Sequence, residues 1–417
     1  MGLDARLEGR QVMFISYNGM LDPLGQTQVL PYLRELAKKG VRFTLLSFER
    51  ARAFEPAGAA KCEELRRELQ TQGIDWHWLR YHQRPSLPAT MYDVLAGIRK
   101  AGALVRRKQI EMVHARGHIP ATIALALKKQ LGVKMIFDVR GLMAEEYVDA
   151  EHWREGSLPY RLTKSTERRI LAATDAIVTL TERIWPIIRE WEGLRGRTPH
   201  HEVIPCCVDT ARFRFSREER ARRREELGLK DQLTLVYSGS LDGWYLTEKM
   251  ADFFASVVRR NPQAHLLWLT TGSHDRVREL MSGRNIEAQN YSVLSVAAAD
   301  VPSYLAAADA GVSFIKRCVS KVASSPTKNG EYLACGLPVV INEGIGDSDA
   351  LVDEWQAGVL IEEFTDQEYD AAAKEIEAMV AAPNAREKAR RVAEQLFHLE
   401  TVGGARYTSL YQRVLNS

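Results

Sequence analysis

The feature that most restricts the fold of this chain is a repeated alternation of short apolar strands with amphipathic helices. An apolar strand is expected at 12–16, followed by a polar, turn-rich loop at 17–26. A helix with one apolar face comes next at 29–37, and a second apolar strand at 43–48. A strand, a helix and a strand within about 35 residues form a βαβ unit, which predicts a parallel sheet.

The alternation runs through two cycles and predicts two α/β domains. Further apolar strands are expected at 112–115, 134–139 and 176–180 in the first cycle, and at 233–238, 264–269, 310–315 and 337–342 in the second. A chain of 417 residues is long enough for two large hydrophobic cores. We therefore expect a first domain at 1–207, a second at 208–400 and a closing amphipathic helix at 401–417.

Composition and charge restrict which binding partners and which cellular compartment we expect. The formal net charge of +3 is too small to indicate a nucleic-acid-binding protein. The five cysteines show no ligand-type spacing beyond one adjacent pair, which favours reduced thiols in the cytosol. The first eleven residues are polar, unlike a signal peptide, and no run of about 20 apolar residues is present for a membrane span. We expect a cytoplasmic protein.

One segment of the second cycle predicts a loop, a short capped helix and a buried strand. Ser325 is a good N-cap and Pro326 fits the first helical position, while Gly336 can end the helix in the left-handed conformation. The free N–H groups at such a helix start favour an anion, and Lys328 and Glu331 add a cation and an acceptor. This arrangement suits a sugar nucleotide. An ordinary capped helix with solvated charges has the same spacing.

The residues of this segment resemble the donor-site motif of the family-4-type retaining glycosyltransferases. In that motif a Pro-Thr-Lys or similar loop leads to Glu and then to Ala-x-Gly-x-Pro-Val-Val, and the corresponding residues here span 326–340. The family's Glu-x7-Glu pattern uses its second Glu to bind the nucleotide ribose, and Glu331 stands at that position. The first Glu is replaced by Ala323, so the resemblance does not imply how the transferred sugar is held.

Other segments extend the resemblance over nearly the whole chain. Residues 203–209 are similar to the Ile-Pro-Asn-Gly-Val-Asp linker of these enzymes, and 22–26, 137–141 and 178–181 also match family patterns. The resemblance implies an α/β fold of the GT-B type, with two Rossmann-like domains facing across a cleft. It further implies that the N-terminal domain binds the acceptor, that the C-terminal domain binds the nucleotide sugar, and that the closing helix crosses back to the N-terminal domain.

Loops after the strands of the first domain supply the expected acceptor side, because parallel sheets bind ligands at the C-terminal ends of their strands. Each of these loops also has a purely structural explanation. The loop after the first strand could be an ordinary turn, the histidine could be hydrogen-bonded to the backbone, and Glu145 and Glu146 could be solvated charges of a helix. Arg140 stands where many relatives carry His, and it is expected to stabilise charge on the donor phosphate. The acceptor-side candidates are Asn18, Asp22, Arg116, His118, Glu145 and Glu146.

Donor-binding residues are expected mainly in the second domain. The Gly loop that begins at Gly239 can present N–H groups to phosphate, although Ser240 and Tyr245 replace the Arg and Lys common in relatives. Basic residues after the strand at 310–315 could substitute, or could be ordinary solvated surface cations. The donor-binding candidates are Gly25, Gln26, Gly239, Ser240, Lys316, Arg317, Ser325, Pro326, Thr327, Lys328 and Glu331; the catalytic candidates are Arg140, Lys328 and Glu331.

The predicted activity is transfer of a sugar from a UDP- or GDP-sugar to a hydroxyl of a glycan, a lipid-linked intermediate or a small molecule. The resemblance implies retention of configuration. No metal-binding pattern, Walker loop or dinucleotide fingerprint is present, so we expect no metal and no cofactor. Two alternatives stay open: a nucleotide-sugar 2-epimerase of the GT-B fold, and a non-catalytic protein that binds a sugar nucleotide or glycan.

A basic amphipathic helix is expected near 94–110, where no acidic residue occurs. Such a helix can rest on an anionic membrane with its apolar side inward, which predicts weak peripheral contact with the inner face of a membrane. The alternative is a helix whose apolar side packs on the sheet. The family's acceptors are often lipid-linked, which is why we predict salt-sensitive vesicle binding.

Overall fold

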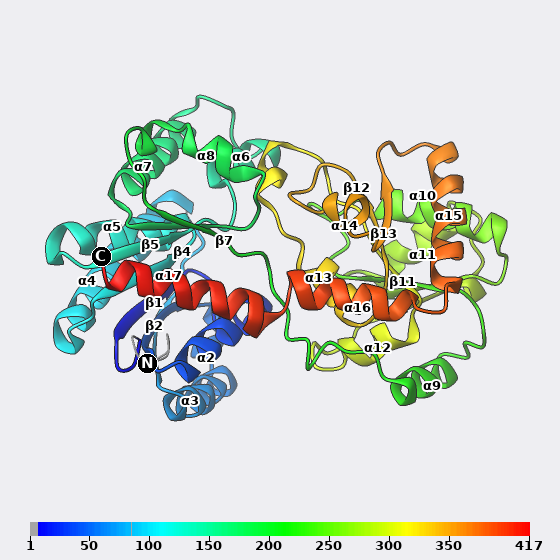
Figure 1. Cartoon of the computed structure of the whole chain (residues 1–417), viewed down its shortest axis with the longest axis horizontal. Helices are drawn as coiled ribbons and strands as arrows, with labels where there is room; N and C mark the ends of the chain where they lie inside the picture. The colour runs from blue at the N-terminus through cyan, green and yellow to red at the C-terminus, as the bar shows by residue number, and fades with distance from the viewer. Residues whose placement is uncertain (1–6, 85) are drawn as a thin grey trace. The chain divides into compact units, whose positions relative to one another are not determined.

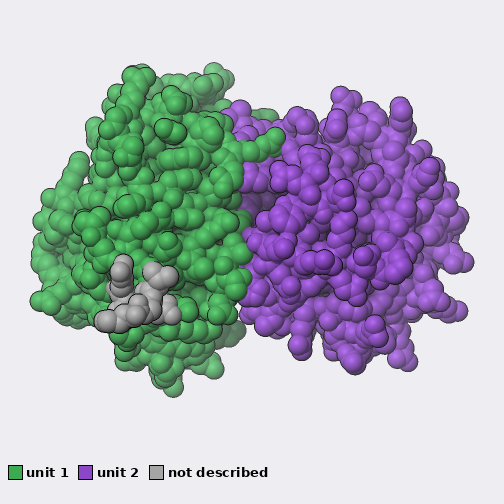
Figure 2. Space-filling view, in the orientation of Figure 1, with its two compact units in different colours: residues 1–205, 399–417 green, residues 206–398 purple. Residues whose placement is uncertain are grey.

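The computed structural model describes residues 7–84 and 86–417, so the first six residues of the polar amino-terminal stretch and Pro85 lie outside the described part of the chain. Two compact units make up the structure (Figures 1 and 2). Unit 1 comprises residues 1–205 and 399–417, and unit 2 comprises residues 206–398. The chain passes from unit 1 to unit 2 after residue 205 and back after residue 398. Both boundaries lie two residues before those expected from the sequence.

Seven parallel strands form the sheet of unit 1, in the order β3-β2-β1-β4-β5-β6-β7. The five interior strands are those predicted from apolar runs, and nearly all of their residues are buried. The two edge strands were missed because they carry many partly exposed polar residues. The bounds are β1 (Gln11–Ser16), β2 (Arg42–Glu49), β3 (Ile74–Arg80), β4 (Met112–Arg116), β5 (Lys134–Asp138), β6 (Ala176–Thr179) and β7 (His200–Val203).

Helices connect these strands, because consecutive parallel strands of one sheet need a crossover connection. The α-helices are α1 (Pro23–Gln28), α2 (Leu30–Lys38), α3 (Pro56–Thr71), α4 (Ser86–Lys108), α5 (His118–Leu131), α6 (Met143–Asp149), α7 (Leu158–Ala173) and α8 (Ile184–Arg189), and the short 3₁₀ turns are Ala51–Phe54 and Glu192–Leu194.

The predicted basic helix is the second half of α4, and its apolar side faces the interior of unit 1. Ala101, Leu104 and Val105 are buried, and a side chain at Gly97 would meet Ile123 of α5 at 2.5 Å. The expectation that this apolar side rests on a membrane is therefore wrong, and packing within the fold accounts for it. None of the helices in the described residues has both the length and the apolar character needed to cross a bilayer.

The C-terminal helix α17 (Ala405–Leu415) returns to unit 1, as predicted (Figure 1). It follows a π-helical turn at Leu399–Gly404. Its predicted packing face is buried, and the Tyr407 hydroxyl donates to Asp138 at the end of β5 over 3.2 Å. A second hydrogen bond of 2.7 Å joins the Tyr411 hydroxyl to His114 in β4. The helix is thus attached to the sheet by buried polar contacts as well as by apolar packing.

Six parallel strands form the sheet of unit 2, in the order β10-β9-β8-β11-β12-β13. The four interior strands were again predicted, and the two edge strands were not. The strands are β8 (Thr234–Ser238), β9 (His265–Leu269), β10 (Tyr291–Leu294), β11 (Ala310–Ser313), β12 (Val339–Asn342) and β13 (Gly358–Ile361). The helices are α9 (Arg217–Glu226), α10 (Thr247–Arg260), α11 (His274–Ser282), α12 (Val301–Ala307), α13 (Thr327–Ala334), α14 (Ala350–Asp353), α15 (Asp366–Ala381) and α16 (Ala385–Leu396), with 3₁₀ turns at Ala288–Asn290 and Val319–Ala323.

The short helix of the donor motif forms, but its start differs from the prediction. Helix α13 begins at Thr327, with Pro326 at the N-cap position and no side-chain cap. The Ser325 hydroxyl instead accepts the N–H of Cys206 over 3.1 Å, so this serine joins two segments of unit 2 rather than capping the helix. Gly336 has a φ of 74° after the helix, which confirms the predicted left-handed position.

Candidate functional site

The loop after β8 in unit 2 is ordered by tyrosine hydroxyls. The Ser238 N–H donates to the Tyr332 hydroxyl over 2.9 Å, and the Tyr237 hydroxyl donates to the carbonyl of Ser240. Tyr332 lies in α13 and is completely buried, as is Tyr237. These contacts hold the Gly239–Ser240 turn against the helix that carries the donor motif.

Lys328 occupies the space that the glycine of this turn leaves open. A Cβ at Gly239 would lie 2.5 Å from Cε and 2.8 Å from Nζ of Lys328. The Lys328 ammonium also lies 3.8 Å from the ring centroid of Tyr245, within the range of a cation–π interaction. Tyr245, which stands where relatives carry a Lys, therefore helps to position a lysine from another segment. The structure brings together Gly239, Ser240 and Lys328 as predicted site neighbours.

A second lysine is held by an aromatic ring beside this loop. Lys321 is buried, and its Nζ lies 3.7 Å from the ring centroid of Trp244. The Lys316 N–H donates to the Trp244 carbonyl over 2.8 Å, which ties the loop to the segment after β11. The Lys316 side chain is exposed. Arg317 is also exposed and pairs with Glu343 over 2.6 Å, so its charge is already shared with a carboxylate.

Glu331 lies one turn beyond Lys328 in α13 and is only partly exposed. Burial raises the pKa of Glu331 to about 7, although the charges of Lys328 and Arg212 act in the opposite direction. With a pKa of about 7, this carboxyl group is partly protonated near neutral pH, and hydroxyl donors from a ligand favour its ionised form. Glu331 is therefore suited to accept hydrogen bonds from a ribose.

The remaining residues of the motif surround the start of α13. Ser325, Pro326 and Thr327 are all partly exposed, so the first turn of the helix is open to a ligand. Ala323, at the position of the family's first Glu, is buried in the 3₁₀ turn that precedes the helix. No carboxylate stands at that position to hold the transferred sugar.

Unit 1 carries a second group of predicted residues at the C-terminal ends of β1 and β4. The Arg116 guanidinium donates to the Asn18 side chain over 3.1 Å, so these two acceptor-side candidates are neighbours. Gln26 donates to the Met20 carbonyl over 2.6 Å within the same loop. Gly25 lies inside α1, where a Cβ would meet the Gly19 carbonyl at 2.2 Å. The close backbone approach at Gly25 is therefore to its own loop.

Asp22 is buried between two arginines. It pairs with Arg50 over 3.1 Å and with Arg52 over 2.5 Å. Its hydrogen-bonding capacity is largely used inside unit 1, which makes it a support for the loop. Glu49, at the end of β2, supports the same loop: it is buried and accepts the Met20 N–H over 2.7 Å. Glu49 was not among the predicted site residues, although its place at a strand end could have indicated it.

A partly buried chain of charged groups joins the predicted residues His118 and Glu145. His118 Nε2 lies 3.0 Å from Glu167, and Lys164 lies 2.5 Å from Glu167 and 2.9 Å from Glu145. Burial would raise the pKa of Glu167, but the partners His118 and Lys164 lower it below its usual range. Glu146 is not in this chain and lies against the backbone of Gly141.

Arg140 and Asp138 form the last group of predicted site residues, at the end of β5. The Arg140 guanidinium lies 3.6 Å from Asp138, which is completely enclosed beside His114 and Tyr407. Burial would raise the pKa of Asp138, yet Arg140 and His114 lower it to about 2. Asp138 is therefore ionised at neutral pH. Arg140 is itself mostly buried, so it extends from a fixed position.

A further buried carboxylate, Asp93, was missed. It accepts the Tyr17 hydroxyl over 2.8 Å and lies 2.6 Å from His82 Nδ1. Asp93 belongs to α4, which places it at the edge of the loop after β1. Its only signal in the sequence was an acidic residue on an otherwise apolar and basic helix. In the described residues no group of three His, Cys, Asp or Glu side chains is arranged to hold a metal ion, and all five cysteines are free thiols.

Two family models match the chain. Residues 25–212 match the family described as Glycosyltransferase Family 4, and residues 219–396 match Glycosyl transferases group 1. No curated protein sequence matched the chain.

Solved glycosyltransferase structures share the fold over almost the whole chain. The sucrose-phosphate synthase tll1590 from Thermosynechococcus elongatus is 15% identical with a TM-score of 0.71, covering 98% of this chain and 99% of that one. A glycosyltransferase from Rickettsia africae is 12% identical with a TM-score of 0.73 and the same coverage. Anabaena Alr3699/HepE, solved with UDP and glucose, is 16% identical with a TM-score of 0.67, covering 96% and 99%.

These structural neighbours confirm the two Rossmann-like domains of the GT-B fold, and the family matches extend across both units. The chain belongs to the family-4-type glycosyltransferases, enzymes that act on nucleotide sugars.

Proposed function

We propose that this protein transfers a hexosyl group from a UDP- or GDP-sugar to a hydroxyl of a glycan, a lipid-linked intermediate or a small molecule, with retention and without a metal ion. The observation that carries the proposal is the arrangement of Lys328 and Glu331 on the open first turn of α13. A structural neighbour is known with UDP and glucose, which supports a nucleoside diphosphate sugar as the donor class.

In the proposed mechanism the protein contributes position and charge. The N–H groups of the first turn of α13 and the Lys328 ammonium stabilise the leaving diphosphate as the glycosidic bond breaks. The acceptor hydroxyl attacks from the same face, and the departing phosphate oxygen takes its proton. Glu331 holds the ribose and so fixes the donor relative to these groups. We also assign Arg140 to stabilising charge on the donor phosphate, as the family resemblance implies.

The acceptor is assigned to unit 1. Asn18 and Arg116 form a paired polar surface at the strand ends, and the His118–Glu167–Lys164–Glu145 chain adds further donors and acceptors. Such groups match the hydroxyls of a sugar. We assign the Asn18–Arg116 pair and the chain from His118 to Glu145 to acceptor binding. Asp22 supports the loop after β1.

A peripheral contact with an anionic membrane is kept as part of the proposal, through exposed residues of the first half of α4. Leu87, Met91 and Leu95 form an exposed apolar ridge along the first half of this helix, at 52%, 61% and 64% exposure. Arg99 continues the ridge one turn further, and exposed basic residues follow it. Apolar insertion beside positive charge fits a membrane containing acidic lipids.

The proposal is tested by incubating the protein with a panel of UDP- and GDP-sugars and hydroxyl acceptors. Nucleoside diphosphate should appear only when donor and acceptor are both present, and the anomeric configuration of the product should match that of the donor. Conversion of a donor without acceptor would identify an epimerase. Binding of a donor, seen as a rise in melting temperature, without turnover on any acceptor would identify a non-catalytic protein.

A further inference from the structure

Unit 2 contains a second set of basic residues that the proposed transfer does not use. A cavity of about 500 Å³ lies beside α9, the end of α13 and the start of α16. Four arginines line it, against a single acidic residue, Glu387. The lining arginines are Arg214, Arg217, Arg386 and Arg390.

Arg386 is the most enclosed of these arginines and lacks one hydrogen-bond acceptor. Its Nη2 donates to the Ala308 carbonyl over 2.6 Å and contacts Asp309 at 3.1 Å. Its Nη1 is buried and, in the described part of the chain, has no hydrogen-bond partner. A buried guanidinium N–H without an acceptor is costly, so an anion bound in the adjoining cavity would be stabilised by this unpaired donor.

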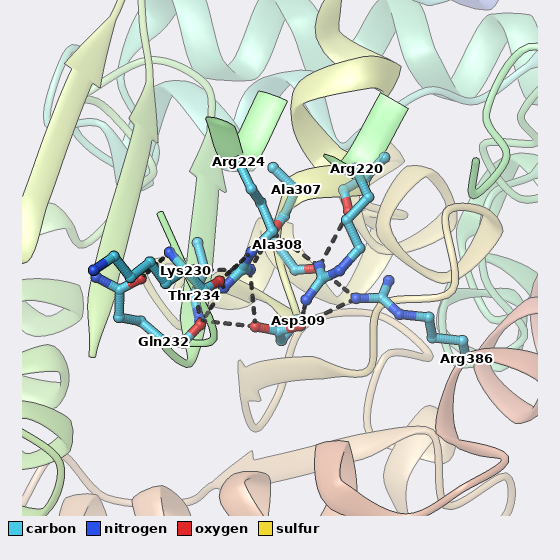
Figure 3. A network of polar contacts seen from close by, with 10 residues as sticks. Arg220, Arg224, Lys230, Gln232, Thr234, Ala307, Ala308, Asp309 and Arg386 are labelled. Carbon is cyan, nitrogen blue, oxygen red and sulfur yellow. Dashed lines mark hydrogen bonds and ion pairs between the residues drawn. The ribbon is translucent and has the colours of Figure 1, made fainter. Parts of the chain in front are cut away.

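The neighbourhood of Arg386 has more positive than negative charge (Figure 3). Asp309 pairs with Arg220 over 2.7 Å and also lies 3.6 Å from Arg224. One carboxylate therefore serves three guanidinium groups. Burial, together with the charge of Arg220, lowers the pKa of Arg386 to about 10. A further anion near Arg386 would balance this excess.

Arg214 and Arg217 have their guanidinium groups available. Both are exposed, and neither forms a hydrogen bond or an ion pair with the residues that the structure describes. The acidic side chain next to them in sequence, Glu218, accepts a hydrogen bond from the Ser216 hydroxyl over 2.7 Å, and this bond together with the charges of Arg217 and Arg214 lowers the pKa of Glu218. Arg390, in contrast, is engaged with two backbone carbonyls and Glu394, so it forms part of the wall.

We propose that this cavity binds a phosphorylated small molecule, at a site separate from the one proposed for the donor. Arg214, Arg217 and the free N–H of Arg386 are suited to bind the phosphate oxygens, because guanidinium groups form short, paired hydrogen bonds with phosphate. The cavity has the size of an organic ligand site rather than of an inorganic ion. Val380, Ala382 and Pro383 supply an apolar wall for the organic part, and the Phe215 ring packs against the Arg386 guanidinium, whose Cζ lies 4.3 Å from the ring centroid.

The site adjoins the opposite end of the helix that carries Lys328 and Glu331. Ala334 and Gly336, at the end of α13, line the cavity, and Arg390 donates to the Ala334 carbonyl over 2.8 Å. Lys328 and the first turn of α13 are not among its lining residues. The two anion sites can therefore be separated by mutation.

The test is calorimetric titration of the full chain with glucose 6-phosphate, inorganic phosphate and glucose at constant ionic strength. Glucose 6-phosphate should bind, glucose should not, and inorganic phosphate should bind at least about tenfold more weakly than the sugar phosphate. The double variant Arg214→Ala/Arg217→Ala should lose roughly tenfold or more in affinity for glucose 6-phosphate. Both side chains are exposed, so the variant is expected to fold, and its melting curve checks this.

Two control variants locate the binding. Arg391→Ala removes an exposed arginine of α16 that does not line the cavity, and it should leave the affinity within about twofold. Lys328→Ala should also leave it unchanged. The proposal is overturned if neither phosphate binds, if the double variant binds normally, if inorganic phosphate binds as well as the sugar phosphate, or if Lys328→Ala abolishes binding. The last result would place the anion in the donor site, whose own function is measured separately with nucleotide sugars.

Discussion

Replacing Glu331 by Gln tests the donor assignment through its pH dependence. With a pKa of about 7 in the free protein, Glu331 is roughly one-tenth ionised at pH 6 and nine-tenths ionised at pH 8. Accepting hydrogen bonds from two ribose hydroxyls requires the ionised form of Glu331. The affinity for a nucleotide sugar should therefore rise about tenfold between pH 6 and pH 8 in the unchanged protein.

The Gln variant should bind more weakly at pH 8, by about 2 to 3 kcal/mol, the scale of hydrogen bonds to a charged group, and should show no rise with pH. Calorimetry with a nucleotide sugar is the assay, since its diphosphate keeps the same charge over this range. Glu375→Gln, on the exposed side of α15, is the matched control and should behave like the parent. An equally steep pH profile in the Glu331 variant would show that another group controls nucleotide-sugar binding.

Further predictions concern charge, stability and membrane contact. Because the pKa of Glu331 is raised on folding, its ionisation makes the folded state less stable as pH rises from about 4.5 to about 7. Glu331→Gln should therefore be about 3 kcal/mol more stable than the parent at pH 8, and equally stable at pH 4, in urea unfolding. Lys328→Ala should lower turnover more than nucleoside affinity, since charge on the phosphate grows as the bond breaks; equal losses would contradict a phosphate role. Tyr411→Phe should cost about 1 to 3 kcal/mol by leaving a buried His114 nitrogen unpaired, whereas Tyr92→Phe, on the surface, should cost almost nothing. Met91→Ser/Leu95→Ser should reduce sedimentation with acidic vesicles at low salt; if the parent does not sediment, the membrane contact is wrong.

The fold could be predicted from the sequence wherever a strand is buried on both faces. All nine predicted strands lie in the interior of the two sheets, where continuous apolar runs are required. All four missed strands, β3, β7, β10 and β13, are sheet edges. An edge strand has fewer neighbours to bury it, so polar residues are tolerated and the apolar run that marks a strand is broken or short.

The donor helix could be predicted because its signals are local. Pro326, Lys328, Glu331 and Gly336 all stand within one short segment, and only the cap was wrong, since Ser325 has a partner more than a hundred residues away. The supporting contacts depend on tertiary structure. Nothing in the sequence indicates that Tyr245 would lie under the ammonium of Lys328.

The central claim is that a nucleotide sugar binds to unit 2 at the start of α13. Hydrogen–deuterium exchange, with and without the nucleotide sugar that most raises the melting temperature, tests it most directly. We expect slower exchange in peptides covering 325–334 and 238–246, and little change in β7 or α15. Slower exchange confined to other segments, with 325–334 unaffected, would contradict the assignment of Lys328 and Glu331 to the donor.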